Sequence, residues 1–157
     1  MIITAICVSP GVKPEEPIPV GGRVVFTSEP KTAEGIFSEY QEIREAPLLR
    51  ETELPAGLFG RPQKEEVKRA KEAVAALLKY GEDCVIAVPP KFLTILLDQM
   101  ERKALVILRR ERGTPKPLER IRISERKDHC GFCNHNCLLR NPGCGIGMDK
   151  ARRMETR

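Results

Sequence analysis

Short apolar runs alternate with helical patterns along the first 123 residues, and this alternation most constrains the fold. We predict buried strands from apolar runs at residues 2–8, 23–27, 83–88 and 104–108. Helices are expected after Pro30, between Pro62 and Gly81, and after Pro90, because apolar residues recur there at helical spacing. Buried strands that alternate with helices are typical of an α/β protein with a parallel sheet.

The local sequence also predicts how the first helix and the segments around it behave. Ser28 is a candidate cap, and Ala33, Ile36, Phe37 and Tyr40 recur at helical spacing, so this helix is expected to run to Tyr40. Proline and glycine at residues 12–22 predict a loop, and residues 48–49 are expected to form a short strand or an edge segment.

The helix that follows Pro62 is predicted to have one apolar face and one charged face. Glu65 precedes Arg69 by four residues, as Lys68 precedes Glu72, and pairs at this spacing stabilise a helix surface. We therefore expect all four charges to lie on a solvated face and to have no functional role.

Residues 118–123 alternate apolar and charged side chains, which indicates a half-exposed edge strand in a hairpin with residues 104–108. The predicted class is α/β, a three-layer sandwich with a mostly parallel sheet and an antiparallel edge hairpin. It is expected to span residues 1–124, with a small cysteine-rich module at 125–157. Ligands of such sheets bind at the carboxyl ends of the strands.

Four short motifs lie at the predicted strand ends or before the long helix. They are Ser9-Pro10-Gly11, Ser28-Glu-Pro-Lys-Thr32-Ala33, Leu49-Arg-Glu51 with Gly60-Arg61-Pro62, and Val88-Pro89-Pro90-Lys91. Their order and spacing over residues 2–123 resemble the histidine phosphatase (phosphoglycerate mutase-like) superfamily. The corresponding motifs of that family are Arg-His-Gly, Ser-Pro-Leu-x-Arg-Ala, Leu-x-Glu with Gly-Arg-Pro, and Val-Ser-His-Gly. The resemblance implies the family's α/β fold; the alternative is an unrelated α/β domain.

The departures from that family concern its catalytic positions. The resemblance aligns Pro10 with the nucleophilic histidine and Pro90 with the second histidine, and it places Ser9 and Thr32 where the family has arginines. Proline has no side-chain nucleophile, so a phosphohistidine intermediate cannot form at Pro10. We therefore expect a phosphatase-like scaffold without that activity, a pseudoenzyme.

Three cations near the strand ends are candidates for a residual anion site. Lys31, Arg50 and Lys91 follow different strands, and Lys91 begins a predicted helix whose N-terminus attracts anions. The alternative is that all three are ordinary surface cations.

Soft metal ligands are concentrated in one stretch of the tail. Cys130, Cys133, Cys137 and Cys144 have the spacing C-x2-C-x3-C-x6-C, and the only two histidines, His129 and His135, lie among them. Four thiolates satisfy tetrahedral zinc, with either histidine as an alternate ligand. A [4Fe–4S] cluster, two disulfides or free thiols are the alternatives. The stretch resembles a zinc knuckle only in size.

The amino-acid composition limits the cellular location and the classes of partner that we expect. No run of eighteen apolar residues and no basic, signal-like N-terminus is present, so we expect a cytoplasmic protein without a membrane span. Abundant Lys, Arg and Glu with scarce Asn and Gln are typical of thermophile proteins. The net charge of +5 permits an acidic ligand or a protein partner, which the sequence does not identify.

Two classes of function remain open from the sequence. One is a binding or regulatory protein with a structural metal site in its tail. The other is an enzyme of unknown class that uses the cysteine cluster for iron–sulfur or thiol redox chemistry. Nucleic-acid binding by the basic tail, around Phe132, is a weaker alternative.

Cys7 and Cys84 lie in predicted buried strands, about three residues apart along the strand direction, and are interpreted as core thiols without a disulfide.

Overall fold

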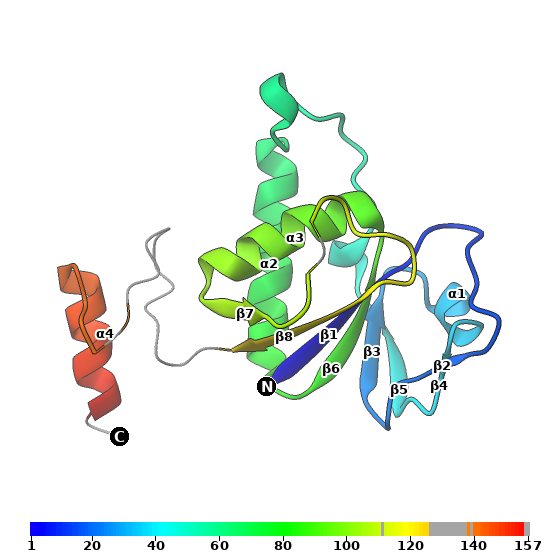
Figure 1. Cartoon of the computed structure of the whole chain (residues 1–157), viewed down its shortest axis with the longest axis horizontal. Helices are drawn as coiled ribbons and strands as arrows, with labels where there is room; N and C mark the ends of the chain where they lie inside the picture. The colour runs from blue at the N-terminus through cyan, green and yellow to red at the C-terminus, as the bar shows by residue number, and fades with distance from the viewer. Residues whose placement is uncertain (111, 126–137, 139, 156–157) are drawn as a thin grey trace.

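The computed structural model describes residues 1–110, 112–125, 138 and 140–155, and within them it shows an α/β fold (Figure 1). The main sheet has the strand order β5-β3-β6-β1-β8-β7. Its strands are β1 (Ile2–Cys7), β3 (Val24–Thr27), β5 (Glu42–Glu45), β6 (Cys84–Val88), β7 (Leu105–Ile107) and β8 (Arg120–Glu125). The helices are α1 (Pro30–Glu34), α2 (Lys64–Tyr80), α3 (Pro90–Arg102) and α4 (Gly145–Glu155), with 3-10 turns η1 (Pro47–Leu49) and η2 (Leu58–Gly60).

The sheet is mixed and mostly parallel. β6 pairs in parallel with both β1 and β3, and β5 extends the parallel part beyond β3. β8 runs antiparallel to β1, and β7 pairs with β8 as the predicted hairpin. The parallel core and the antiparallel side are therefore confirmed.

Two hydrophobic clusters form on opposite faces of the sheet, because successive strand residues point to opposite sides. Ile3 and Ala5 of β1 belong to the cluster that packs against α2 and α3. Ile6 of β1 and Val25 of β3 belong to the other cluster, with α1 and the short strands β2 (Ile18–Pro19) and β4 (Phe37–Ser38). Figure 1 shows α2 and α3 crossing over one side of the sheet.

The two long helices agree with their sequence patterns. α2 ends at Gly81, whose φ of 73° is the left-handed conformation that glycine adopts without strain, and its amide donates to the Leu77 carbonyl. α3 begins at Pro90 and buries every apolar position predicted for it: Phe92, Leu93, Leu96, Leu97 and Met100. Both predictions are confirmed.

The prediction for the first helix was wrong in its length and its cap. α1 ends at Glu34 before Gly35, and its N-cap is Glu29 rather than Ser28. Phe37 instead pairs with Ile18 in the small sheet of β2 and β4. Ile36 and Phe37 are buried in the cluster beside this small sheet, whereas Tyr40 is exposed, and helical spacing alone does not reveal this.

The segment after it also differs from expectation. Residues 48–49 lie in a 3-10 turn, and the strand is β5, whose residues are mostly exposed. β8 is an internal strand between β1 and β7 rather than an edge. It alternates because Ile121 and Ile123 pack into the core while the arginines at 120 and 122 remain exposed on the other side.

None of the described helices is long and apolar enough to cross a membrane.

Candidate functional site at the ends of the parallel strands

A cleft of about 130 Å³ lies where β1, β3 and β6 end. Cys7 pairs with Val88, and Thr27 with Ala87, so the three strands stop at nearly the same level. The residues that follow them line the cleft together with the segment after η1. The polar lining consists of Ser9, Thr27, Ser28, Glu29, Thr32, Arg50 and Glu51, beside Pro10 and Pro89.

Three of the four positions aligned with phosphatase catalytic residues gather at this cleft. Ser9, Pro10 and Thr32 all line it, whereas Pro90 begins α3 and its neighbour Pro89 lines the cleft instead. The Thr32 hydroxyl donates to a carboxylate oxygen of Glu29, 3.1 Å away. Among the described residues, the lining therefore offers hydroxyl groups, two carboxylates and the Arg50 guanidinium, but no imidazole.

The Glu51 carboxylate occupies the N-terminus of α3. Its Oε1 accepts hydrogen bonds from the backbone amides of Phe92, at 3.1 Å, and Thr52, at 2.9 Å. The positive end of a helix dipole stabilises such a carboxylate. The sequence suggested that the N-terminus of this helix could attract a bound anion. In the structure, the Glu51 carboxylate occupies that position.

Arg69 holds the segment that carries Arg50 and Glu51. Its buried guanidinium donates to the carbonyls of Leu48 (2.8 Å), Arg50 (2.7 Å) and Glu51 (3.4 Å). It also pairs with buried Glu66 and lies 3.8 Å from the centroid of the Phe92 ring. These contacts place Arg69 directly beneath one wall of the cleft.

The sequence-based assignment of Arg69 to a solvated face was therefore wrong. Arg69 and Glu66 are each only 6% exposed, and Arg69 pairs with Glu66 rather than with Glu65. The signal was present in the sequence, because positions 66 and 69 continue the buried stripe formed by Ala70, Ala73 and Leu77. A charged pair inside an apolar stripe of a helix indicates a buried ion pair rather than a solvent-exposed face.

The three cations considered for anion binding do not line one cavity. Arg50 lines the cleft, where it donates to the Pro47 carbonyl and lies 3.9 Å from Glu53. Lys91 lines a separate, larger groove with Arg61 and Arg110. Lys31 is exposed on α1 and does not line the cleft.

Cys7 and Cys84 are buried and free of disulfides. Burial raises the pKa of both thiols to about 11, and nearby Glu119 and Glu51 add to the effect at Cys7. Cys84 pairs with Ile3, so Cys7 and Cys84 are offset by four residues along the strands. The sequence had suggested an offset of about three residues. Both thiols are neutral near pH 7, and neither is a ready nucleophile.

Most of the predicted metal site lies outside the described residues. Cys130, Cys133, Cys137, His129 and His135 all fall there, and Cys144 alone is described. The Cys144 thiol is exposed and unpaired, immediately before α4. The part of the chain that the structure describes contains no group of three or more metal-binding side chains.

Comparison with protein-family models, with curated proteins and with solved structures finds no match to this chain. The resemblance to the histidine phosphatases therefore stays a prediction that rests on the motifs and on the order of the elements.

Proposed function

We propose that residues 1–124 form a non-catalytic binding domain on a phosphatase-like, three-layer scaffold. The observation that carries this proposal is the lining of the cleft. It contains Pro10, which the resemblance aligns with the nucleophilic histidine, and Glu51, which covers the α3 N-terminus. A side chain without a nucleophilic atom cannot accept a phosphoryl group. A carboxylate at the helix N-terminus repels the same group.

The charges around the cleft favour one class of ligand. Its lining carries two carboxylates, Glu29 and Glu51, against one cation, Arg50. Hydroxyl groups of Ser9 and Ser28 add donors and acceptors at the same cleft. A small neutral or cationic molecule that donates hydrogen bonds, such as a polyol or an amine, suits this lining better than a phosphate.

Two measurements on the full chain test this assignment. We expect no phosphate release from a generic aryl phosphate above the level of a heat-denatured sample. In a thermal-shift panel, small amines or polyols should raise Tm, and the shift should be lost in Glu51→Gln. The exposed neighbour Glu53→Gln serves as the matched control. Turnover of the phosphate ester, or stabilisation by phosphate alone, would overturn the proposal.

We further propose that the tail binds one zinc ion through Cys130, Cys133, Cys137 and Cys144, in a structural role. The C-x2-C pair and the glycines beside Cys144 suit a tight tetrahedral site. The free, exposed thiol of Cys144 is compatible with a ligand role. Because a closed site with four thiolates leaves no open position for substrate, this assignment supports a binding or regulatory protein over an enzyme.

Metal analysis of freshly purified protein, with an absorption spectrum, tests the tail. One zinc per chain without colour is expected, and Cys133→Ser should lose the metal. The substitutions His129→Ala and His135→Ala, made singly, should retain it. A brown sample absorbing near 400 nm would indicate iron–sulfur. Absence of both metal and titratable tail thiols would indicate disulfides.

A further inference from the structure

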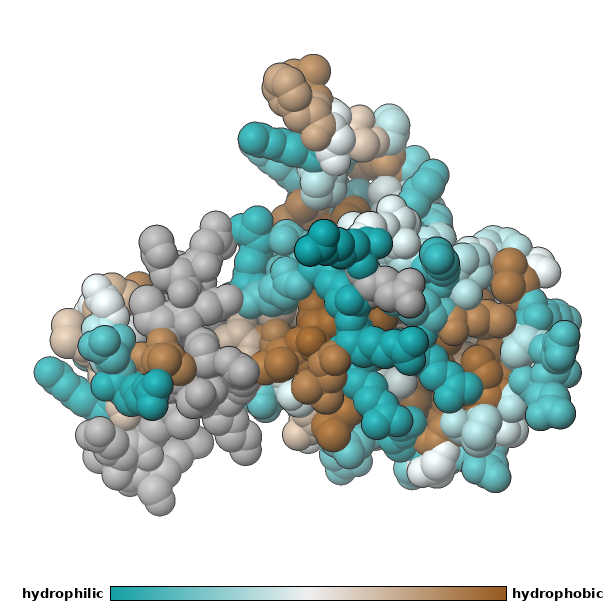
Figure 2. Space-filling view, in the orientation of Figure 1, coloured by the Kyte–Doolittle hydropathy of each residue, from teal (hydrophilic) through white to brown (hydrophobic). Residues whose placement is uncertain are grey.

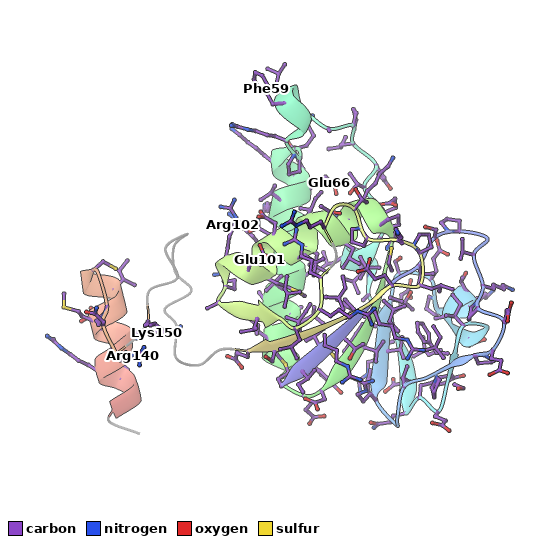
Figure 3. All side chains as sticks on the ribbon, in the orientation of Figure 1. Phe59, Glu66, Glu101, Arg102, Arg140 and Lys150 are labelled. Atoms are coloured by element: carbon purple, nitrogen blue, oxygen red, sulfur yellow. The ribbon has the colours of Figure 1, made fainter. Side chains whose placement is uncertain are left out.

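The two most exposed large apolar side chains among the described residues lie next to each other in the sequence. Leu58 and Phe59 are 84% and 94% exposed. They sit in the 3-10 turn η2, at the end of a projection that precedes α2 (Figure 1). Figure 2 shows hydrophobic atoms at the extremity of this projection, and Figure 3 shows Phe59 pointing outward from it. We name residues 58–59 the apolar tip.

The backbone of the tip is held in place despite this exposure. Gly57 and Arg61 are joined by a backbone hydrogen bond of 2.7 Å, and the Gln63 side chain donates to the Pro55 carbonyl at 3.2 Å. Phe59 has a φ of 59° and a ψ of 28°, a left-handed conformation that is costly for a bulky residue. Strain that serves to display an apolar side chain indicates a contact outside the folded chain.

The same chain carries an apolar groove near the other end of α2. The groove has a volume of about 500 Å³ and lies between the last turns of α2 and the segment from β5 to η1. Its walls include Phe26, Pro47, Leu48, Ala76, Leu77 and Tyr80. Arg44 and Lys79 are the cations in its lining. This volume and this lining fall within the range of sites that bury small apolar groups.

We propose that two copies of this chain associate by placing the apolar tip of each in the groove of the other. α2 has 17 residues and is therefore about 25 Å long, and it separates the tip from the groove. A two-fold axis across this helix sets two copies of α2 antiparallel and brings each tip level with the partner's groove. Such an interface is self-complementary and closes as a dimer.

The charges of α2 agree with the antiparallel arrangement. Glu65 lies in the first turn, close to the tip, and Lys79 lies in the last turn, in the groove lining. In the dimer, Glu65 of one copy faces the end of the partner's helix that carries Lys79. Antiparallel helices also set opposite ends of their dipoles together.

Sedimentation velocity of the full chain across a concentration series, with reductant present, tests the dimer. We expect a monomer–dimer equilibrium for the wild type. Phe59→Ser should raise the dimer Kd at least about 100-fold, because the substitution removes two buried rings from a symmetric interface. Ala76→Glu in the groove should act in the same direction. Leu108→Ser, at another exposed apolar position, is the control and should leave the Kd unchanged.

A mixing experiment separates this arrangement from a general loss of solubility. The Phe59→Ser copy keeps its groove and the Ala76→Glu copy keeps its tip, so a mixture should form heterodimers more tightly than either variant forms homodimers. Because reductant is present throughout, an intermolecular disulfide does not account for the dimer. A wild type that is monomeric at every concentration would overturn the proposal, whether or not the tip then binds lipid vesicles. An unchanged Kd for Phe59→Ser would overturn it equally.

Discussion

The α/β body and the cysteine-rich tail differ in what holds their polar side chains in place. In the body, the Arg69 guanidinium is surrounded by carbonyls, by Glu66 and by the Phe92 ring, all fixed by a continuous core. Among the described residues after Glu125, no large apolar side chain is buried, and Ile146 and Met148 are more than 40% exposed. The described part of the tail therefore offers little hydrophobic burial.

This difference indicates that the tail, and not the body, needs a metal ion or a disulfide for its stability. A segment that lacks a core of its own usually depends on a metal or a disulfide. The body has a large hydrophobic core, so it does not depend on a metal or a disulfide. Its two free thiols, Cys7 and Cys84, are themselves part of this core. We expect changes in the polar contacts of the body to alter its stability and changes in metal to alter the tail alone.

The largest effect is expected from Arg69→Ala. Removal of the guanidinium leaves Glu66 as an unpaired buried charge and frees three carbonyls, and loss of one partner of a buried pair typically costs about 3–5 kcal/mol. Urea unfolding measures the change. Arg102→Ala, whose pair with Asp98 is exposed, is the control and should cost less than about 1 kcal/mol. Equal losses for the two variants would contradict a structural role for Arg69.

The second largest effect is expected at high pH, from the buried thiols. The pKa of Cys7 and Cys84 is about 11 in the folded chain, against 9.0 as the ordinary value. Because the folded state favours the neutral thiol, stability is unaffected below pH 9 and falls as the pH rises from 9 to 11. The loss should approach about 2 kcal/mol for each thiol.

A double variant, Cys7→Ala with Cys84→Ala, isolates this contribution from the lysines and tyrosines that also titrate. Urea unfolding at pH 8, 9, 10 and 11 should show a steeper decline for the wild type than for the variant. Parallel pH profiles for the two proteins would show that the thiols are not buried as described.

A smaller effect is expected from Glu51→Gln. The amide can still accept hydrogen bonds from the backbone of α3, but the charge that complements the helix dipole is lost. We expect a loss of about 1 kcal/mol in the free energy of unfolding, with Glu53→Gln near zero as the exposed control. A gain in stability for Glu51→Gln would instead indicate that the Glu51 carboxylate lowers the stability of the fold and is kept because it binds a ligand.

The smallest effect is expected from chelation of the zinc ion that we propose for the tail. The Tm of the body should change by less than about 1 °C, because no described residue of the tail belongs to the hydrophobic clusters of the sheet. Circular dichroism during heating, with and without chelator, measures this. A large fall in Tm would show that tail and body fold as one unit.

The sequence was sufficient for the elements whose pattern is set by burial. The β1 and β6 runs, α3 and the Gly81 end of α2 could be predicted because apolar periodicity and backbone chemistry agree there. Local spacing failed for Ile36 and Phe37, because partners distant in the chain bury them against a small second sheet.

The candidate site was predictable in its location but not in its chemistry. Strand ends and motifs placed Ser9, Pro10 and Thr32 at one cleft, as parallel pairing requires. The contact of Glu51 with Phe92 and the carbonyl contacts of Arg69 join segments that only the tertiary fold brings together. A one-dimensional pattern does not contain such contacts.

The central position of β1 has a consequence for how the chain folds during synthesis. Ile3 pairs with Cys84 on one side and with Ile123 on the other, so β1 has no neighbouring strand until residues 84–88 have been made. Pairings this distant make folding slow, and they leave an apolar segment exposed to aggregation in the meantime. Translation speed and chaperone supply should therefore affect the yield of this protein more than its final stability suggests.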